Sequence, residues 1–513
     1  MINTLQIQVL PEIASTQELL KKIIAKQMNI PQGDIKHIEI LKRSIDARQK
    51  TTKINLKVSI YVKEEFVQKV EDYPEYQDVS GKDEVIVIGA GPAGLFAALK
   101  LIEKGKKPIV LERGKDVRSR RRDLVNLTKN HIVSKDSNYC FGEGGAGTFS
   151  DGKLYTRSKK RGDVNKILDV LVRHGATPNI RVNSHPHIGT NKLPKIIQTI
   201  RDTIIRYGGQ VLFDSRVTDI NIKNYAVKGV ELQNGTKIEA NKIILATGHS
   251  ARDIFELLHQ KKIAIEAKAF ALGIRVEHTQ DLIDQIQYKC KSRGAFLPPA
   301  PYSIVKQVGG RGVYSFCMCP GGIIAPCATS PGEVVTNGWS PSKRDYPTSN
   351  SGIVVELKVE DFEKFKNFGP LAGVEFQKEI EQSAWKLAGE TQRVPAQRLV
   401  DYTNNILSTD LPKSSYIPGT KSAMINTIFP EFIAKNLQEG LRQIGEQMKG
   451  YFTNEAVVHA PESRTSSPVR IPRDSATLEH PQIKGLYPCG EGAGYAGGII
   501  SASIDGEKCA EKC

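Results

Sequence analysis

Apolar and polar positions alternate with two different periods along the first 80 residues of this 513-residue chain. The stretches LQIQVL (5–10) and INLKVSIYV (54–62) alternate as strands do. Between them, STQELLKKIIAKQM (15–28) repeats its apolar positions with helical spacing, and Ser15 is a suitable N-cap. These patterns predict a small N-terminal α+β domain over residues 1–80, and the polar, turn-forming residues 71–83 predict a linker after it.

A strand–helix–strand pattern begins at residue 84. The apolar run Val85–Ile88 is followed by glycines, by an apolar helical stretch over 95–104 and by a second apolar strand that ends at Glu112. Residues 192–209 then predict a helix closed by two glycines, and 210–248 predict short strands, two of which flank an Asn-Gly turn. This order is typical of a nucleotide-binding domain built from βαβ units.

The pattern changes after residue 250. Alternating segments, turns and helical stretches are mixed up to about residue 454, and the apolar strand with its glycines then returns near the end of the chain. We therefore predict an α/β fold with a discontinuous Rossmann-like domain (84–250 and 455–513). An inserted mixed α+β domain (251–454) would interrupt it.

The sequence GAGPAG places Gly89, Gly91 and Gly94 in the GxGxxG spacing between the first strand and its helix. The first glycine allows a tight turn, the second lets a pyrophosphate approach the backbone, and the third lets helix and strand pack closely. Pro92 and Ala93 belong to the same motif. The N-terminal amides and the positive dipole end of the helix would face the phosphates.

Glu112 ends the second strand 23 residues after Gly89 (112 − 89 = 23), and Arg113 follows it. A carboxylate at this place can accept both ribose hydroxyls of an adenosine. Strand, glycine loop, helix and acid occur in the required order, so the pattern predicts a dinucleotide cofactor rather than a chance glycine-rich turn. It leaves NAD and FAD open.

Two more glycine-rich stretches lie far away along the chain. One is FGEGGAGTFSDGK (141–153), with the candidate cofactor-binding residues Gly144, Gly145, Ala146, Gly147 and Thr148. The other is YPCGEGAGYAGGIISASIDG (487–506), with the candidates Gly490, Glu491, Gly492, Gly497, Gly498 and Ile499. Glycine costs roughly 1 kcal/mol against alanine inside regular structure. Three such loops therefore predict one ligand that approaches the backbone closely at all three.

The motifs carry a resemblance to known proteins. The chain is similar to the glutathione-reductase-type flavoproteins in VIVIGAGPAGLFAALKL, FGEGGAGTFSDGKL, IILATGHSARD, FCMCPGG, RTSSPVRI and GLYPCGEGAGYAGGIISASIDG. More closely, it resembles a bacterial family of FAD-dependent dehydrogenases, or NAD(P)/FAD-dependent oxidoreductases, whose substrate is unsettled. These stretches span residues 85–506, and LKRSIDARQK (41–50) extends the resemblance to the N-terminal domain.

The resemblance implies an FAD-binding domain of the glutathione-reductase type that holds one non-covalent FAD, with the inserted domain as a cap over the flavin. Val217 would contact the adenosine through its backbone, and Glu491 would lie near the ribityl–pyrophosphate. A helix N-terminus around Gly498 and Ile499 would point at the flavin and stabilise the negative charge of the reduced ring. Beneath the cofactor, the resemblance places Ala246, Thr247 and Gly248.

The implied activity is hydride transfer between N5 of the flavin and an unidentified small organic substrate, with NAD(P)H as a candidate transient electron donor. The sequence contains no second GxGxxG in a strand–turn–helix context and lacks the CxxxxC pair of the two-domain disulfide reductases. A nicotinamide donor would therefore dock over the flavin ring. No catalytic side chain is assigned, because most of the expected contacts come from the backbone.

Two other functions stay open. The formal charge of +16 and the cluster ERGKDVRSRRRD (112–123) favour a flavin-dependent tRNA-modifying enzyme. An aromatic content of 7% and the absence of the motifs of those families argue against nucleic acid as a partner, and a lysine-rich solvated surface explains the charge equally well. A prenyl-lipid reductase at a membrane surface would need an apolar tunnel beside the flavin.

Composition indicates the compartment. The chain has no run of 18 apolar residues, and its first residues lack the basic and apolar regions of a secretory signal. Its eight cysteines are scattered without a CxxC pair, which is typical of a reducing compartment. We expect a cytoplasmic protein without stable membrane association, and the sequence leaves the oligomeric state open.

Cysteines and histidines outside the glycine loops are further candidates. Cys317 and Cys319 in FCMCPGG should face one side of a strand. A redox pair is one interpretation, but packing is favoured, because cysteines on one face of a regular strand form a strained disulfide. No metal site is predicted, since Cys327, His278 and His249 lack ligand spacing. His249 either lines the flavin pocket or is a structural histidine.

Charged side chains are concentrated in APESRTSSPVRIPRD (460–474). This stretch is either a salt-bridged connector between the domains or a clamp for an anionic substrate or a nicotinamide phosphate. The stretches RVEH (275–278) and NGWS (337–340) are two more candidates to face the pocket.

Overall fold

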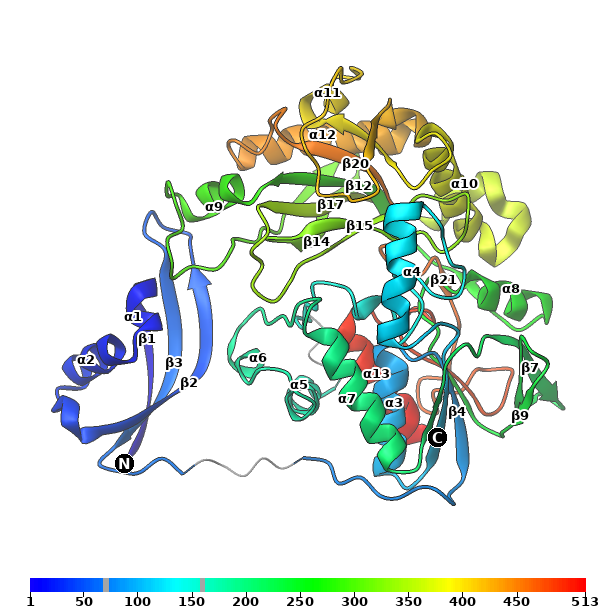
Figure 1. Cartoon of the computed structure of the whole chain (residues 1–513), viewed down its shortest axis with the longest axis horizontal. Coiled ribbons are helices and arrows are strands. Elements are labelled where there is room, and N and C mark those ends of the chain that lie inside the picture. Colours follow the sequence, from blue (N-terminus) through cyan, green and yellow to red (C-terminus); the bar gives the residue numbers. More distant parts are fainter. Residues whose placement is uncertain (68–72, 157–161) are drawn as a thin grey trace.

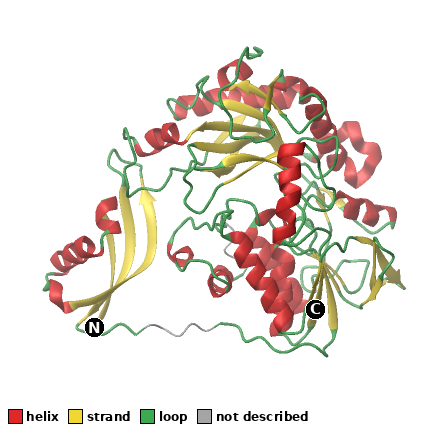
Figure 2. Cartoon of the chain, viewed as in Figure 1, coloured by secondary structure: helices red, strands yellow, loops and turns green. Residues whose placement is uncertain are grey.

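A computed structural model of the chain describes residues 1–67, 73–156 and 162–513. The small N-terminal domain lies at the left of Figure 1, the domain with the parallel sheet at the lower right, and the inserted domain above it. Figure 2 shows helices packed beside both larger sheets. The first two residues of the predicted linker, 71 and 72, lie outside the described residues, and residues 73–83 contain no helix or strand.

The N-terminal domain is a three-stranded antiparallel sheet of order β1-β3-β2 with two helices on one face. Its elements are β1 (Ile2–Val9), α1 (Pro11–Ser15), α2 (Gln17–Met28), η1 (Gln32–Asp34), β2 (Ile35–Asp46) and β3 (Lys53–Val62). Alternation in β3 buries every second side chain against α2, as the pattern predicts. The predicted N-cap is wrong: Thr16 caps α2, while Ser15 ends α1 and its hydroxyl donates to the carbonyl of Pro11.

The second domain contains a five-stranded sheet of order β22-β10-β4-β5-β6, in which every neighbouring pair is parallel. The strands are β4 (Glu84–Ile88), β5 (Lys107–Leu111), β6 (Gln210–Leu212), β10 (Ile243–Leu245) and β22 (Leu486–Pro488). Because β22 pairs with β10, the C-terminal segment completes the sheet begun at residue 84. This confirms the predicted α/β fold with a Rossmann-like domain made from two pieces of the chain.

Helices cover one face of this sheet, where Val85 and Val87 of β4 point. They are α3 (Pro92–Glu103), α5 (Val164–Arg173), α6 (Asn179–Val182), α7 (Leu193–Arg206) and α13 (Ile499–Lys512). α4 (Val117–Asn130) runs upward toward the inserted domain (Figure 1). The Gly pair predicted to end the helix near residue 209 does so, and Gly208 has φ +89°.

The opposite face, where Ile86 and Ile88 point, is covered by a three-stranded antiparallel sheet and one helix. These elements are β7 (Val217–Lys223), β8 (Ala226–Leu232), β9 (Lys237–Glu239) and α8 (Arg252–Gln260). The predicted Asn-Gly turn joins β8 and β9, and Gly235 has φ +81° there. Alternation along β4 therefore supplies both hydrophobic layers of the domain.

The inserted domain is built on a seven-stranded sheet of order β13-β14-β17-β12-β20-β18-β19. Its strands are β12 (Phe270–Thr279), β13 (Val305–Val308), β14 (Arg311–Cys319), β17 (Thr348–Leu357), β18 (Val394–Arg398), β19 (Thr420–Ser422) and β20 (Val457–Glu462). Beside it lie α9 (Gln280–Tyr288), η4 (Val359–Leu371), α10 (Ala372–Leu387), α11 (Leu399–Thr403), η5 (Ile425–Ile428) and α12 (Glu431–Gln447). A hairpin of β15 (Ile323–Pro326) and β16 (Thr336–Trp339) completes it.

The structure places both ends of the insertion later than the sequence analysis does. α8 packs with Ile254 and Phe255 into the core of the parallel-sheet domain, so residues just after 250 still belong there. β20 pairs with β12 and β18, so the inserted sheet continues past residue 455. The chain leaves and re-enters the parallel-sheet domain where β11 (Glu266–Ala267) pairs with β21 (Val469–Arg470). The pattern of apolar residues alone did not reveal where the chain passes between the two domains.

A buried ion pair joins β12 to β20 inside the inserted domain. The Arg275 guanidinium is fully buried and donates to Glu462 through Nε and Nη2 at 2.7 and 2.9 Å. It also donates to Asn350 at 2.7 Å. A buried ion pair of this kind adds little stability compared with a pair of apolar side chains in its place. Removing one partner, however, leaves the other charge unpaired in a dry interior.

We expect Arg275→Leu to destabilise the inserted domain by about 3–5 kcal/mol, because it leaves the Glu462 carboxyl without its cation. The double variant Arg275→Leu/Glu462→Leu should recover most of that loss. Both tryptophans of the chain, Trp339 and Trp385, lie in this domain, so their fluorescence during urea denaturation reports its unfolding. Lys364→Leu, which breaks an exposed pair with Glu379, is the control and should cost less than about 1 kcal/mol. If Arg275→Leu alone denatured at the same urea concentration as the parent protein, this role of the ion pair would be contradicted.

Candidate functional site

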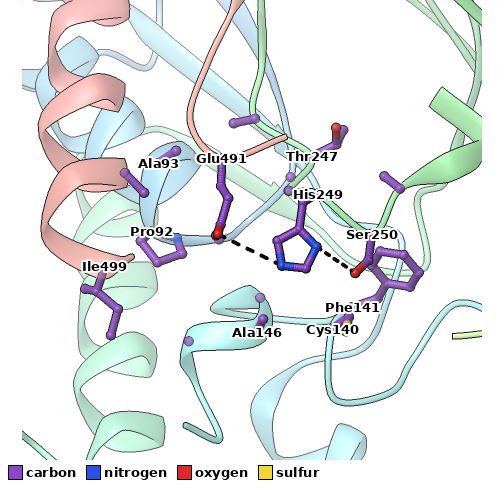
Figure 3. Close-up of a pocket in the computed structure, with 18 of the residues that line it drawn as sticks. Pro92, Ala93, Cys140, Phe141, Ala146, Thr247, His249, Ser250, Glu491 and Ile499 are labelled. Carbon is purple, nitrogen blue, oxygen red and sulfur yellow. Dashed lines mark hydrogen bonds and ion pairs between the residues drawn. The ribbon is translucent and has the colours of Figure 1, made fainter. Parts of the chain in front are cut away.

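A cavity of about 400 Å³ lies between the parallel-sheet domain and the inserted domain. Its wall includes the carboxyl ends of β4, β5 and β10, which is where ligands bind in open α/β sheets. Figure 3 shows Pro92 from the first glycine loop, Ala146 from the second, and Glu491 and Ile499 from the third around the same space. The three loops therefore meet at one cavity, as predicted.

Each glycine of the first loop is required for a different reason. Gly89 has φ +105°, and a Cβ there would lie 2.5 Å from the carbonyl oxygen of Ala246. A Cβ at Gly94 would lie 1.9 Å from the carbonyl oxygen of Gly89. A Cβ at Gly91 would meet no atom within 4 Å, because Gly91 faces the cavity. The first two glycines thus satisfy the fold, while Gly91 leaves space for a ligand.

Two helices begin at the cavity wall. α3 starts at Pro92 after the N-cap Gly91, and α13 starts at Ile499 after the N-cap Gly498. Neither N-cap provides a side-chain hydrogen bond to the helix. Backbone amides in the first turn of each helix, after Pro92 in α3 and from Ile499 in α13, are therefore available to an anionic ligand, and both helix dipoles present their positive ends to it.

Glu112 has a structural role that sequence reasoning missed. Its buried carboxylate accepts hydrogen bonds from the backbone amides of Ala90, Gly114 and Gly142, each at 2.9 Å. It therefore ties the first glycine loop to the second. A carboxylate has about four acceptor positions, and the three amides use three of them, so about one position remains for a ribose hydroxyl. An alanine at this position would leave three buried amides unpaired and could not report on ribose binding alone.

The second glycine loop is wedged between the other two. A Cβ at Gly145 would lie 3.2 Å from Cα of Gly91, and a Cβ at Gly147 would lie 3.4 Å from the side chain of Ile499. The loop contains a short 3-10 helix, η2 (Gly145–Gly147). Its small residues let the first and third loops approach on either side.

Arg120 supports this loop from behind. Its guanidinium is fully buried and donates to the carbonyl oxygens of Asn138, Tyr139 and Glu143 at 2.7–2.9 Å. The basic cluster 112–123 is thus not one binding surface: Arg113 lines the cavity, Arg120 is internal, and Arg121 and Arg122 are exposed on α4. Arg113 is paired with Asp136 and Asp253 at 2.8 and 2.9 Å.

Gly498 is not explained by packing. A Cβ there would meet no atom within 4 Å, although the backbone has φ +147°, which other residues rarely adopt. Gly497 also faces open space, but its φ is not positive. The structure therefore excludes the alternative that Gly498 only permits close packing of helix and sheet. A substitution at Gly497 tests the space beside α13 without straining the backbone.

His249 and Glu491 face one another across the cavity wall (Figure 3). Nε2 of His249 lies 4.0 Å from Oε1 of Glu491, and Nδ1 shares a hydrogen bond of 3.1 Å with the Ser250 hydroxyl. Burial, with Arg464 and Arg252 nearby, lowers the pKa of His249 to about 4. Burial raises the pKa of Glu491 to about 7. Near neutral pH the imidazole is uncharged, so this contact is not an ion pair, and the carboxyl is poised to take up or release a proton.

Most of the predicted cofactor-binding residues line the cavity. They are Gly89, Gly91, Pro92, Ala93, Glu112, Arg113, Gly145, Ala146, Gly147, Val217, Ala246, Thr247, Gly248, Glu491, Gly497, Gly498 and Ile499. The others lie behind its wall: Gly94, Gly144, Thr148, Gly490 and Gly492. These support the loops, and the Thr148 hydroxyl, for example, donates to the carbonyl of Glu143 at 2.7 Å.

The charged connector 460–474 is largely a set of buried ion pairs. Arg464 donates to Glu381 at 2.8 Å and to Glu333 at 2.9 Å, and Arg473 to Asp505 at 2.6 Å. This favours the interpretation as a salt-bridged connector over an anion clamp, although Arg464 also borders the cavity. Of the other candidate stretches, NGWS contributes Asn337 to the cavity wall, whereas RVEH contributes no residue to it.

Several residues of the wall were not predicted as cofactor ligands. They are Asp151, Lys153, Tyr155, Ser215, Arg216, Asp253, Phe316 and Cys317, among others. The motif FCMCPGG directed attention to Cys317, and Lys153 ends the glycine-rich stretch 141–153 but was not named among its candidate residues. A smaller cavity of about 40 Å³ adjoins the large one and shares His249, Asn337 and Arg464 with it. Its wall also contains Tyr139, Phe149 and Trp339.

The described residues contain one group with the spacing of a metal site: Cys489, Asp505 and Cys509, whose ligand atoms lie within 4.8 Å of one another. Arg473 already supplies a cation there, 2.6 Å from Asp505 and 3.4 Å from the Cys509 sulfur. Within the same described segments, no helix combines the length and the apolar character needed to span a bilayer.

Three family profiles match the chain. Residues 83–282 match the pyridine nucleotide-disulphide oxidoreductases, and residues 269–465 match the C-terminal domain-like region of the FAD-dependent proteins. Residues 1–61 match a domain of unknown function. The second match coincides with the insertion as the structure bounds it, between β11 and β21.

Two protein relatives resemble the chain to different extents. An uncharacterized protein of Clostridium beijerinckii is 40% identical over 512 residues, which cover 96% of this chain and 95% of that protein. A thiamine thiazole synthase of Methanococcus vannielii is 25% identical over 190 residues, 35% of this chain and 61% of that enzyme. The first relative spans all three domains, whereas the second covers about a third of this chain.

Two of the similar solved structures cover most of this chain. A geranylgeranyl bacteriochlorophyll reductase-like protein of Thermoplasma acidophilum has a TM-score of 0.35 at 13% identity and covers 84% of this chain and 78% of its own. L-proline dehydrogenase of P. horikoshii has a TM-score of 0.32 at 14% identity and covers 84% of this chain and 92% of its own. Scores this low establish no functional kinship.

Gly91→Ala and Gly94→Ala should separate binding from folding. Gly94→Ala places a methyl group 1.9 Å from a backbone oxygen, so we expect a lowered melting temperature of the ligand-free protein. Gly91 has φ −76° and open space around it, so Gly91→Ala should melt like the parent and yet bind FAD more weakly. Thermal denaturation without FAD and titration with FAD measure the two effects. Equal loss of stability in both variants would contradict the assignment of Gly91 to ligand space.

Proposed function

We propose a reaction for this chain, which belongs to the family of FAD-dependent oxidoreductases: transfer of a hydride between N5 of a bound FAD and a small organic substrate. The observation that carries the proposal is the meeting of three glycine-rich loops and two helix N-termini at one cavity. NAD(P)H is proposed as a transient donor. The described parts of the chain contain one Rossmann-type parallel sheet, so such a donor would enter through the same cavity.

The residues present fit an FAD molecule. A Cβ added to Gly91, Gly248, Gly497 or Gly498 would meet no atom within 4 Å, so each of these cavity-lining glycines borders space that a ligand can fill. The N-terminus of α3 would hold the pyrophosphate, with the adenosine toward Glu112, Arg113 and Val217. The N-terminus of α13 would then lie beside the flavin ring. This orientation of FAD follows from where the helix N-termini, which donate hydrogen bonds, and the open space beside the glycines lie along the cavity.

When bound, FAD would supply a two-electron carrier that gives or accepts hydride at N5. The amides at the start of α13 present positive charge where reduction adds negative charge. Glu491 holds or releases a proton near pH 7 beside that helix, and the neutral imidazole of His249 lies 4.0 Å from it. Ile499 and Pro92 border the same space with apolar surface.

The substrate is proposed to enter from the side of the inserted domain. Phe316, Asn337 and Thr465 form that wall, and the smaller cavity lined by Tyr139, Phe149 and Trp339 opens beside it. Aromatic rings and one amide suit a compact substrate with an apolar part and a hydrogen-bonding group. Arg464 does not require an anionic substrate, because Glu333 and Glu381 already neutralise it.

Purified protein should be yellow and carry about one FAD per chain. The contacts available at the cavity are backbone amides and open glycines, so the cofactor should leave on heating or acid treatment. Absorbance of the released flavin and its mass give the stoichiometry and identity. Recovery of FMN or NAD alone, or failure to take up added FAD, would refute the assignment.

FAD binding should weaken as the pH rises through about 7. The pKa of Glu491 is raised to about 7, so below that value the carboxyl is neutral and does not repel the phosphates. Above it the carboxylate repels them, and affinity should fall by at most about tenfold per pH unit. The folded protein also holds this proton more tightly than the unfolded chain does. The unfolded carboxyl titrates near its ordinary value of 4.5, so the stability without ligand falls as the pH rises from about 4.5 to about 7 and levels off above that, before the affinity for FAD begins to fall.

Glu491→Gln removes the titrating group while keeping its size. Between about pH 6 and 9, the affinity of this variant for FAD should therefore change much less than the roughly tenfold per pH unit allowed for the parent. Glu511→Gln, on the exposed side of α13, is the matched control and should behave as the parent. Quenching of FAD fluorescence at each pH gives the dissociation constants. The same pH dependence in Glu491→Gln and the parent would show that another group is responsible.

A further inference from the structure

Two thiols and one ammonium group lie together at the cavity wall. Nζ of Lys153 is 3.7 Å from Sγ of Cys317 and 3.9 Å from Sγ of Cys319. Lys153 is the last residue of the second glycine-rich stretch, whereas the cysteines end β14 in the inserted domain. Both sulfurs therefore face the same cation, although 164 and 166 residues separate them from it. Lys153 and Cys317 line the cavity, and Cys319 is fully buried behind them.

Neighbouring charges leave the Lys153 ammonium directed at the thiols. Its acidic neighbour, Asp151, lies 3.8 Å away and is already held by two hydrogen bonds from Arg344, at 3.1 and 2.7 Å. Arg275 adds a second positive group, whose Nη1 lies 3.4 Å from the carbonyl oxygen of Cys317. Arg275 is itself paired with Glu462, so Lys153 is the cation that favours a thiolate at this site.

The two thiols differ in acidity. The neighbouring Cys319 thiol lowers the pKa of Cys317, and Lys153 and Arg275 lower it further. The neighbouring Cys317 and burial raise the pKa of Cys319. Of the two thiols, Cys317, which reaches the cavity, is therefore the one that loses its proton first.

The backbone at the two cysteines departs from that of a regular strand. In a regular strand, residues two apart have Cα atoms roughly 6.6 Å apart, near the upper limit of about 6.8 Å for a disulfide. Here the pairing of β14 with β17 shifts between Phe316 and Cys319, and Cys317 has φ +45°. The Cys319 thiol folds back and donates to the carbonyl of Cys317 at 3.3 Å. The preference for a packing role assumed a regular strand, and the structure does not have one there.

We propose that Cys317 and Cys319 are a redox pair that alternates between a dithiol and a disulfide and exchanges two electrons with the flavin. The proposal rests on the proposed function, since it takes FAD as the electron partner. In the oxidising direction, the S–H bond of Cys319 breaks and an S–S bond to the Cys317 thiolate forms. The two electrons and the proton pass to oxidised FAD and give the anionic reduced flavin, so charge and atoms balance.

Cys317 is the member of the pair through which a substrate would react. A small disulfide is attacked by the Cys317 thiolate, which displaces one substrate thiolate and forms a mixed disulfide. The Cys319 thiol then displaces the second half of the substrate as a thiol and closes the protein disulfide, which the reduced flavin anion reopens. The substrate class that fits this site is a small disulfide or, in reverse, a pair of thiols. Lys153 is a positioning residue that keeps the charge on Cys317.

Anaerobic dithionite titration of the diamide-oxidised FAD holoenzyme tests the pair. The parent should consume two electrons for the flavin and two more for the disulfide. Cys317→Ser and Cys319→Ser should each consume only the flavin's two. Cys489→Ser is the matched control, because Cys489 belongs to a different buried group with Cys509, and it should titrate as the parent. A parent enzyme that takes up only two electrons per FAD would overturn the proposal.

A second readout does not depend on flavin chemistry. After diamide treatment and unfolding, the peptide that contains residues 317–319 should resist iodoacetamide, and after reduction it should react at both cysteines. In the folded, reduced protein, Lys153→Met should move the pH midpoint of Cys317 alkylation upward by about one pH unit or more, and Lys153→Arg should restore most of the shift. An unchanged midpoint in Lys153→Met would overturn the role of Lys153.

The outcomes distinguish this inference from the proposed function. FAD bound at one per chain, with both thiols still alkylated after oxidation, would overturn the redox pair and leave the flavoenzyme assignment intact. A protein that binds no FAD would overturn the proposed function and, with it, the exchange with flavin. Resistance of only one of the two cysteines would indicate a partner other than the neighbouring thiol and would also overturn the pair.

Discussion

Helix α3 is confined between β4 and α13 at separations that only glycine permits, and the cavity depends on this packing. A Cβ at Gly94 would lie 1.9 Å from the oxygen of Gly89, and a Cβ at Gly506 would lie 2.0 Å from the oxygen of Ala93. The close contact sets the N-termini of α3 and α13 at one cavity, although they lie at opposite ends of the domain's sequence. Two positive helix ends at one site are what a ligand with a diphosphate and a reducible ring requires.

Buried charges fix the inserted domain over that site. Arg252 on α8, in the parallel-sheet domain, pairs with Glu333 and Glu381 of the inserted domain at 3.0 and 2.9 Å. Arg464, in the returning connector, contacts the same two carboxylates. Because both arginines hold it, the pKa of Glu381 falls to about 2 despite its burial. Such a network is not a large source of stability, but its geometry is specific, and it sets the position of the wall that carries Phe316 and Cys317.

The charge of the groups that line the cavity differs from one region of its wall to another. Helix dipoles make one region positive. The uncharged His249 lies beside Glu491, whose pKa is raised to about 7, and Lys153 faces the Cys317 sulfur elsewhere on the wall. A flavin in this space would meet positive charge where it becomes negative on reduction. It would also meet a sulfur pair where a second electron carrier is useful. The proposed chemistry therefore uses charge placement rather than a single catalytic acid.

The sequence by itself determined the parts of this protein that depend on neighbours in the chain. Alternation gave β4 and its two buried faces, the GxGxxG spacing indicated which glycine faces the ligand, and the run after Gly498 predicted the start of α13. Only the tertiary structure revealed that Glu112 ties two loops together and that Lys153 meets Cys317. Backbone conformation and periodicity are set within a few residues, whereas these contacts join segments tens to hundreds of positions apart. Their geometry exists only once the sheets, the bulge in β14 and the inserted domain have packed.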